Sequence, residues 1–199
     1  MVKRILLAGL LSAIGMFVWS FVAHMVLPLG TIGIREIPNE APVLSAMQAA
    51  MEESSGLYLF PGTGLGPDAS SKQRRDAMQQ YGQKLATSPS GMLIYHPPGA
   101  KALSPGQLGT EFLTEFAEAL LLAFLLSRAR LKSLGARVGF ALIVGLVAAI
   151  TTNVPYWNWY GFPFSYTATY MSTQIVNFLV AGMIAALVLK NAPPAGAIA

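Results

Sequence analysis

The stretch ILLAGLLSAIGMFVWSFVAHMVLP, residues 5–28, decides how the rest of the chain is interpreted. Its only ionisable side chain is that of His24. A helix that crosses a bilayer needs about 20 mostly apolar residues, because each adds about 1.5 Å across a hydrocarbon core of roughly 30 Å. The stretch is longer than the apolar part of a signal peptide, and no clear cleavage site follows it. It therefore predicts an uncleaved anchor, with residues 1–30 as a first transmembrane helix.

Three later segments repeat this apolar character, at residues 105–131, 137–154 and 167–190. The first of them has a readable start, because Ser104, Pro105 and Gln107 form a capping box with proline at the first helical position. The whole chain is 54% hydrophobic and only 11% charged, whereas a soluble domain has roughly 25% charged residues. The predicted fold is an all-α integral membrane protein with four transmembrane helices.

Basic residues indicate the orientation of these helices. Lysine and arginine without acidic neighbours occur near the N-terminus, between the second and third helices, and after the fourth. These residues are Lys3, Arg4, Arg128, Arg130, Lys132, Arg137 and Lys190. The positive-inside rule places such segments in the cytoplasm, so both termini, including a tail at residues 191–199, are predicted to be cytoplasmic. The net charge of +4 is then a topology signal and a contact with anionic lipid, not a sign of nucleic-acid binding.

Residues 31–104 are too long for a simple connection and predict a small extracytoplasmic α/β cap. Apolar residues at helical spacing predict a helix near residues 40–54, and a second helix fits residues 70–86. The tetrapeptides LYLF (residues 57–60) and MLIY (residues 92–95) are expected to pair as strands. The helix between them makes a βαβ-like unit possible. Because two strands and two helices bury little surface, the cap is expected to rest on the outer ends of the membrane helices.

Polar side chains inside the predicted membrane segments form the first candidate site. Glu111, Glu115 and Glu118 are spaced to share one helix face, with Glu115 about 6 Å and Glu118 about 10 Å deeper than Glu111. An ionised carboxylate in hydrocarbon costs about 2.5–3.5 kcal/mol or more, so such residues face a partner or a wet cavity, or hold a proton. The partners predicted from the other helices are His24, Asn153, Gln174 and Asn177.

Two interpretations of this polar cluster stay open. It is either a proton-linked or ligand-binding cavity, or a hydrogen-bond network that fixes helix packing. His24 and His96 are the only histidines and form a candidate pair of haem ligands. No metal site is predicted, because the Glu-x-x-His spacing of carboxylate metal sites is absent. There are no cysteines and no catalytic motif was recognised, so an enzyme is not expected.

The second candidate site is the aromatic sequence VPYWNWYGFP, residues 154–163. It is predicted to be a loop at the membrane surface, with Pro155 ending the third helix, because tryptophan and tyrosine favour the headgroup layer. The alternative is an aromatic platform against a quinone, a pigment, a sugar or a partner helix. The aromatic residues concerned are Tyr156, Trp157, Trp159, Tyr160 and Phe162.

Four segments together resemble a family of four-helix bacterial membrane proteins. They are FVWSFVAHMVLPLG near the start, GLYLFPG, MLIYHPPG and VPYWNWYGFP. The resemblance covers nearly the whole chain and implies a location in the bacterial inner membrane. It implies no activity, no cofactor and no role for any single residue.

Three functions are compatible with this sequence. The favoured one is an accessory or structural subunit of a larger bacterial membrane complex that docks through its membrane helices and its outer cap. The reasons are that the chain is small, lacks catalytic motifs and has small-residue helix faces at Gly9, Ala13 and Gly139 that suit close helix contact. The second is a small transporter or ligand-binding protein with a carboxylate-lined outer cavity. The third is a haem- or quinone-linked redox protein. No cofactor is predicted under the favoured function, and its partners are the bilayer and other membrane subunits.

Overall fold

The structure is a computed structural model, and it describes residues 1–51 and 54–190. The chain divides into two compact units. The helix unit contains Met1–Arg35 and the chain from Ala102 onward, and the cap unit contains Glu36–Lys101. The tail predicted for residues 191–199 lies outside the described residues.

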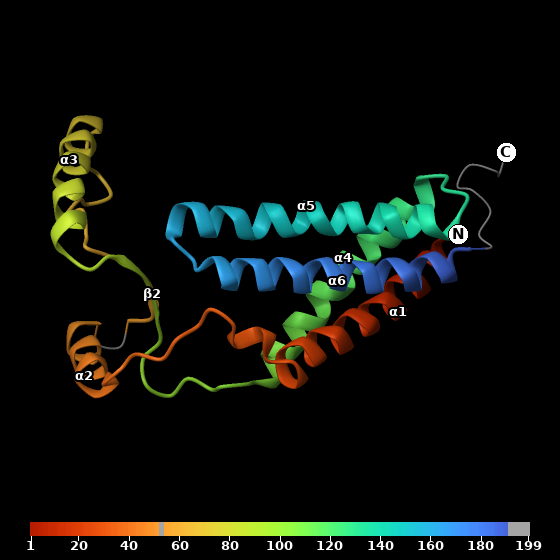
Figure 1. The fold of residues 1–199 in the computed structure, drawn as a ribbon, viewed down its shortest axis with the longest axis horizontal. Coiled ribbons are helices and arrows are strands. Elements are labelled where there is room, and N and C mark those ends of the chain that lie inside the picture. The colour runs from red at the N-terminus through yellow and green to blue at the C-terminus, as the bar shows by residue number, and fades with distance from the viewer. Residues whose placement is uncertain (52–53, 191–199) are drawn as a thin grey trace. The chain divides into compact units, whose positions relative to one another are not determined.

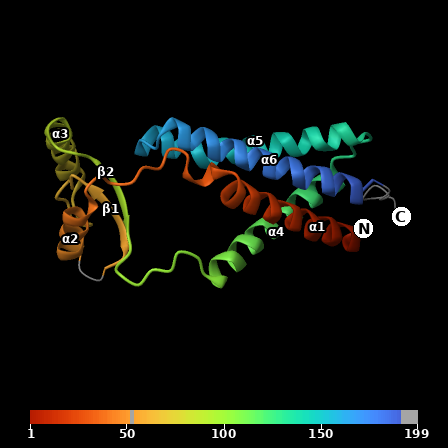
Figure 2. The same cartoon turned by 60° about the horizontal axis from the view of Figure 1, so that its bottom comes forward.

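In its described part, the helix unit contains four long helices that run alternately in opposite directions (Figure 1). They are α1 (Val2–Phe21), α4 (Pro105–Arg128), α5 (Leu134–Tyr160) and α6 (Phe164–Val188). A π-helical turn, Val22–Val26, and a short 3-10 helix, Pro28–Thr31, follow α1. The start of α1, the α4–α5 connection and the end of α6 lie at the same end of the unit (Figures 1 and 2).

Three segments of the described chain are long and apolar enough to cross a membrane: Val2–Val26, Leu134–Tyr160 and Phe164–Val188. This finding supports the predicted membrane protein. The fourth predicted span, α4, has 24 residues and is long enough. Helix α4 is not one of the three apolar segments, because every stretch of α4 long enough to span a membrane contains all three glutamates, which are charged or polar.

Small residues let the helices of this unit approach closely. A Cβ atom added to Gly9 would lie 3.1 Å from the Cα of Leu120, so α1 and α4 are in close contact there. A Cβ atom added to Gly145 would lie 2.6 Å from the Cβ of Phe178 on α6. The predicted small-residue face at Gly9 is therefore a contact face. Gly139 has no neighbouring atom within 4 Å of such a Cβ among the described residues.

Buried hydrogen bonds also join the helices. The fully buried Ser12 hydroxyl of α1 donates to the backbone carbonyl of Ala181 at 3.0 Å. The indole N–H of Trp19 donates to the carbonyl of Thr173, also at 3.0 Å. At the opposite end of α6, Arg137 donates to the carbonyls of Leu131 and Ala186. These bonds connect α1 and the start of α5 to α6.

Replacing Ser12 with alanine tests the contribution of one such bond. The variant keeps the close α1–α6 approach and loses only the hydroxyl, so its free energy of unfolding in detergent is expected to fall by roughly 0.6 kcal/mol, the average for hydrogen bonds between membrane helices. Equilibrium unfolding of the purified variant and of the wild type measures the difference. A loss above about 2 kcal/mol would show that the hydroxyl has a further role.

The prediction that Pro155 ends the third helix is wrong. Helix α5 continues through Pro155 to Tyr160 and ends at Gly161, whose φ of 72° is the left-handed conformation that glycine adopts without strain. Proline is tolerated within membrane helices because neighbouring groups and local adjustments satisfy the carbonyl that loses its N–H partner. The aromatic segment is therefore mostly helical, and only its last residues connect α5 to α6.

The cap unit contains α2 (Glu40–Met51), β1 (Gly56–Phe60), α3 (Ser71–Thr87) and β2 (Gly91–Tyr95). The predicted strand pairing is confirmed. The two strands run antiparallel, however, with Gly56 opposite Tyr95 and Phe60 opposite Gly91, so the unit is not a βαβ crossover, which joins parallel strands. Both helices lie on one side of the strand pair (Figures 1 and 2).

The cap unit has almost no core. Among its described residues only Ala77 and Tyr95 are buried. The ring of Tyr95 packs edge-on against that of Tyr58, on the same face of the sheet. The predicted helix near residues 40–54 is observed as α2, with residues 52–53 outside the described part of the chain.

Candidate functional site

The centre of the predicted polar cluster is the carboxyl group of Glu115. Its side chain is only 2% exposed, in the middle of α4. Oε1 accepts a hydrogen bond of 2.6 Å from the hydroxyl of Ser20 on α1. The side chain of Asn177 on α6 also interacts with this carboxyl group. Residues of three helices therefore meet at one acidic side chain.

The other two glutamates have different surroundings. Glu118 is partly buried, and Glu111 is exposed. Both are close enough to Glu115 for their charges to act on it. The predicted common face of the three glutamates therefore places them near one another, but only Glu115 is enclosed by other helices.

His24 is connected to this cluster indirectly. It lies in the π-helical turn after α1, and its Nδ1 is 2.9 Å from the backbone carbonyl oxygen of Ser20. Its ring packs edge-on against Tyr170 of α6, with centroids 6.0 Å apart. The ring also fills the space beside Gly30, where an added Cβ would lie 2.7 Å from it. The pairing of His24 with a glutamate is not observed in the described residues.

A second pair of polar residues joins α5 to α6. The amide nitrogen of Asn153 donates to the side-chain oxygen of Gln174 at 3.1 Å and to the carbonyl of Ala149 at 2.9 Å. The predicted members of the cluster therefore form two groups. Glu115 and Asn177 belong to the first, and Asn153 and Gln174 belong to the second.

Ser20 is a member of the Glu115 cluster that the sequence pattern did not single out. A serine in an apolar helix usually bonds to its own backbone, so it carries no recognisable signal. A weak signal was available, since Ser20 precedes His24 by four residues and therefore lies on the same helix face. Its role became visible only when the register of α1 against α4 was known.

The aromatic residues form a continuous series of ring contacts along one end of the helix unit. Tyr156 contacts Tyr160 and Phe162, with centroids 5.8 and 5.4 Å apart. Phe162 contacts Tyr166 at 5.4 Å, and Tyr166 stacks on Tyr170 at 4.4 Å. Because Tyr170 also contacts His24, the series connects the end of α5 to the end of α1.

The two tryptophans stand apart from this series. Trp157 contacts Phe164 at 6.3 Å, and Trp159 is 78% exposed. Exposed tryptophan at the end of an apolar helix is typical of the membrane interface, where the ring is apolar and the N–H stays hydrated. The interfacial interpretation of the segment stays a prediction, as does the aromatic binding platform.

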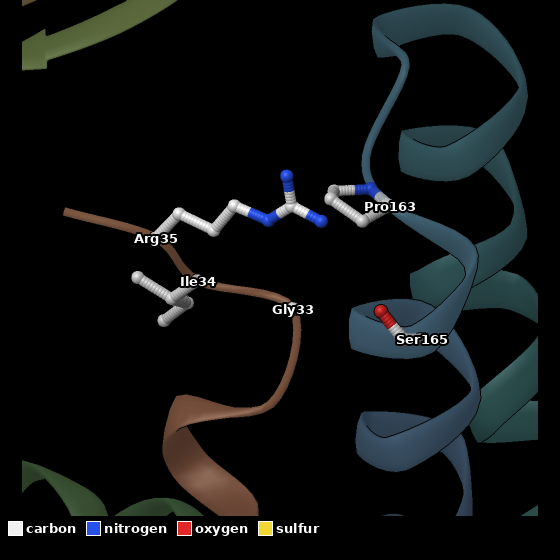
Figure 3. Close-up of a pocket in the computed structure, with 5 residues that line it drawn as sticks. All are labelled: Gly33, Ile34, Arg35, Pro163 and Ser165. Carbon is white, nitrogen blue, oxygen red and sulfur yellow. The ribbon is translucent and has the colours of Figure 1, made fainter. Parts of the chain in front are cut away.

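A cavity of about 510 Å³ lies beside the start of α6. Its lining residues are Gly33, Ile34, Arg35, Pro163 and Ser165, as Figure 3 shows. Gly33 has a φ of 83° and approaches Tyr166 so closely that an added Cβ would lie 2.7 Å from its backbone nitrogen. None of the three glutamates lines this cavity, so it is not the predicted carboxylate-lined site.

The described residues contain no group of three or more metal-binding side chains. The haem hypothesis pairs His24 of the helix unit with His96, which lies in the cap unit. Haem, quinone or pigment contact therefore remains a prediction, as does the transporter hypothesis. Comparison with protein-family models, with curated proteins and with solved structures finds no match to this chain.

Proposed function

We propose that the protein is an accessory subunit of a larger membrane complex in the bacterial inner membrane, and that it docks on a partner protein through its cap unit. The observation that carries this proposal is an exposed apolar face on the β1–β2 sheet. The proposal includes four transmembrane helices, with both termini in the cytoplasm and the cap unit on the outer side.

The strand register defines this apolar face. Leu57 lies opposite Ile94, and Leu59 lies opposite Met92. Since successive side chains of a strand point to opposite faces, these four residues share one face of the sheet. Leu57 is 64% exposed, Leu59 53% and Ile94 69%. We call this set of four residues the sheet face.

A cap of this kind is not expected to be stable alone. An isolated pair of strands is marginal in water and needs a further strand or a packed helix. Almost no side chain of the described cap unit is buried, although both faces of its sheet carry apolar residues. Exposed apolar side chains that gather on one face of a sheet indicate an interaction surface.

The chemistry of the sheet favours a protein over lipid as the occupant. Each of the two strands has an outer edge with backbone N–H and C=O groups that its neighbour in the sheet does not bond. Lipid tails offer these groups no hydrogen bonds, whereas a partner chain can add a strand and cover the sheet face at once. We therefore propose a polypeptide partner.

The fourth span is supported by geometry and not by hydropathy. Helix α4 has 24 residues, or about 36 Å at 1.5 Å per residue, which exceeds the roughly 30 Å hydrocarbon core. It packs against α1 and α6, two of the three apolar helices. Its most buried carboxyl group, that of Glu115, is enclosed by those two helices and is not directed at lipid.

Photo-crosslinking in the native membrane tests the docking proposal. A photoreactive amino acid at Leu57 or Ile94 is expected to give one adduct of defined mass with a second protein. The same group at Gln79, an exposed polar position on α3, is expected to give no such adduct. The products are identified by mass spectrometry after purification through a tag on the helix unit.

Two results would contradict the proposal. Adducts with lipid alone would show that the sheet face lies on the membrane. Adducts within the chain, between Leu57 or Ile94 and the helix unit, would show that the protein covers its own sheet face. Either result leaves no surface for the proposed partner.

A further inference from the structure

Glu115 is the most enclosed acidic side chain of the described residues, and its two oxygens have different surroundings. Oε1 accepts the hydrogen bond from Ser20. Oε2 is buried and has no hydrogen-bond partner. Buried polar atoms are nearly always hydrogen-bonded, and an unsatisfied one costs about 1–3 kcal/mol, so an orphaned oxygen needs an explanation.

The explanation lies in a second orphaned atom. Oδ1 of Asn177 is also buried without a partner, and the side chain of Asn177 interacts with the Glu115 carboxyl group. Both atoms are acceptors when Glu115 is ionised, so they cannot bond to each other. A single hydrogen atom between the two groups would satisfy both.

We propose that Glu115 is a proton-binding site in which the carboxyl group is neutral, accepts from Ser20 at Oε1 and donates from a protonated Oε2 to Oδ1 of Asn177. The ligand is a single proton, and the site joins α1, α4 and α6. This arrangement removes both orphaned acceptors. It also removes the cost of an enclosed carboxylate, which is several kcal/mol for an ion without a counter-charge.

The titratable and polar groups around the site come from several elements. On α4, Glu111 and Glu118 add like charge. In the π-helical turn that follows α1, the titratable group is His24, whose ring contacts the backbone carbonyl of Ser20. On α6, Tyr170 contacts His24, and on α5 the neutral Asn153 bonds to Gln174 of α6.

No lysine or arginine is among the described groups that interact with Glu115. A charged carboxylate would therefore lack a counter-cation at this site. The competing arrangement is an Asn177 amide rotated by 180°, so that its nitrogen donates to an ionised Glu115. The two arrangements place the amide atoms almost identically and differ by one proton, so the experiment must detect that proton.

Infrared difference spectroscopy of the purified protein at pH 7 detects a proton on the Glu115 carboxyl group. The wild-type spectrum minus that of Glu115→Gln is expected to contain the C=O stretch of a protonated carboxylic acid, shifted when H₂O is replaced by D₂O. Glu118→Gln is the matched control, because Glu118 lies on the same helix but has no hydrogen bond to Ser20. The acid band assigned to Glu115 is expected to persist in that variant.

A second variant covers the case in which Glu115→Gln does not fold. Asn177→Leu keeps the size of the side chain and removes the proposed acceptor, so the acid band is expected to move in frequency without disappearing. A wild-type minus Glu115→Gln spectrum with carboxylate bands and no acid band at pH 7 would overturn the proposal. So would an acid band that Asn177→Leu leaves at its original frequency.

Thermal unfolding gives an independent readout. If the folded protein holds a proton that the unfolded chain releases, raising the pH removes stability from the wild type. The unfolding temperature of the wild type is expected to fall as the pH is raised through the titration of Glu115, and that of Glu115→Gln is expected to change less. Identical pH profiles for the two proteins would contradict the proposed proton.

Discussion

Replacing Gly182 with leucine is expected to weaken the packing of α5 against α6 strongly. A Cβ atom added at Gly182 would overlap the side chain of Ala141 on α5, and leucine adds three further carbon atoms. Overpacking a core in this way typically costs about 1–3 kcal/mol and sometimes more. We expect the upper end of that range, because Ala141 is fully buried and cannot move aside. The unfolding temperature of the purified variant measures the effect.

A matched control lies on the facing helix. Gly139→Leu makes the same change on α5 at a position with no described atom within 4 Å of an added Cβ. It is expected to unfold close to the wild-type temperature. The pair Gly182→Ala with Ala141→Gly is expected to recover part of the stability that Gly182→Ala loses, because the second change removes the overlapping methyl group. Equal effects at Gly182 and Gly139 would contradict the described helix contact.

The second large effect is expected at the sheet face. The double variant Leu57→Lys with Ile94→Glu places opposite charges on two directly paired residues, so strand pairing is retained while the face becomes polar. Burying one such side chain contributes about 1.5–3 kcal/mol. Loss of both is therefore expected to weaken docking by about 3 kcal/mol or more, which corresponds to over 100-fold.

Co-purification of the tagged double variant from the native membrane measures this loss. The control is Leu85→Glu, which introduces a charge at an exposed apolar residue of α3 in the same unit. The control is expected to keep its partner, and both proteins are expected to keep the helix content of the wild type. A double variant that retains its partner in wild-type amount would show that the sheet face is not the docking surface.

The long elements of this fold could be predicted from local sequence. Apolar length alone identifies the segments Val2–Val26, Leu134–Tyr160 and Phe164–Val188. The capping box at Ser104 is observed in full, with the Ser104 hydroxyl accepting from the Gln107 backbone and the Gln107 side chain accepting from the Ser104 backbone. Such signals need only neighbouring residues, and for that reason they are visible in one sequence.

Features that depend on a distant part of the chain could not be predicted from the local sequence. Pro155 was expected to end α5, because the rule for soluble helices does not include the surroundings that a membrane bundle supplies. Ser20 carried no signal, because its partner Glu115 is far away in sequence and is found only by helix register. The antiparallel direction of β1 and β2 is likewise a property of the path between the strands, not of either tetrapeptide.

The sequence predicted which residues belong to the candidate site better than it predicted their contacts with one another. Sequence reasoning selected Glu115 and Asn177 as members of one cluster, and they interact. It also included His24, which contacts a backbone carbonyl and not a carboxyl group. Depth along a helix can be estimated from residue number, whereas the direction of a side chain around the helix axis depends on packing that the sequence does not display.

The mass of the intact particle tests the proposed subunit role most directly. The protein would be extracted from its native membrane in a mild detergent and measured by native mass spectrometry, which removes the detergent. We predict a mass well above the 21.2 kDa of one chain, with at least one different polypeptide in fixed proportion. A particle that contains only copies of this chain would contradict an accessory subunit that docks through its cap.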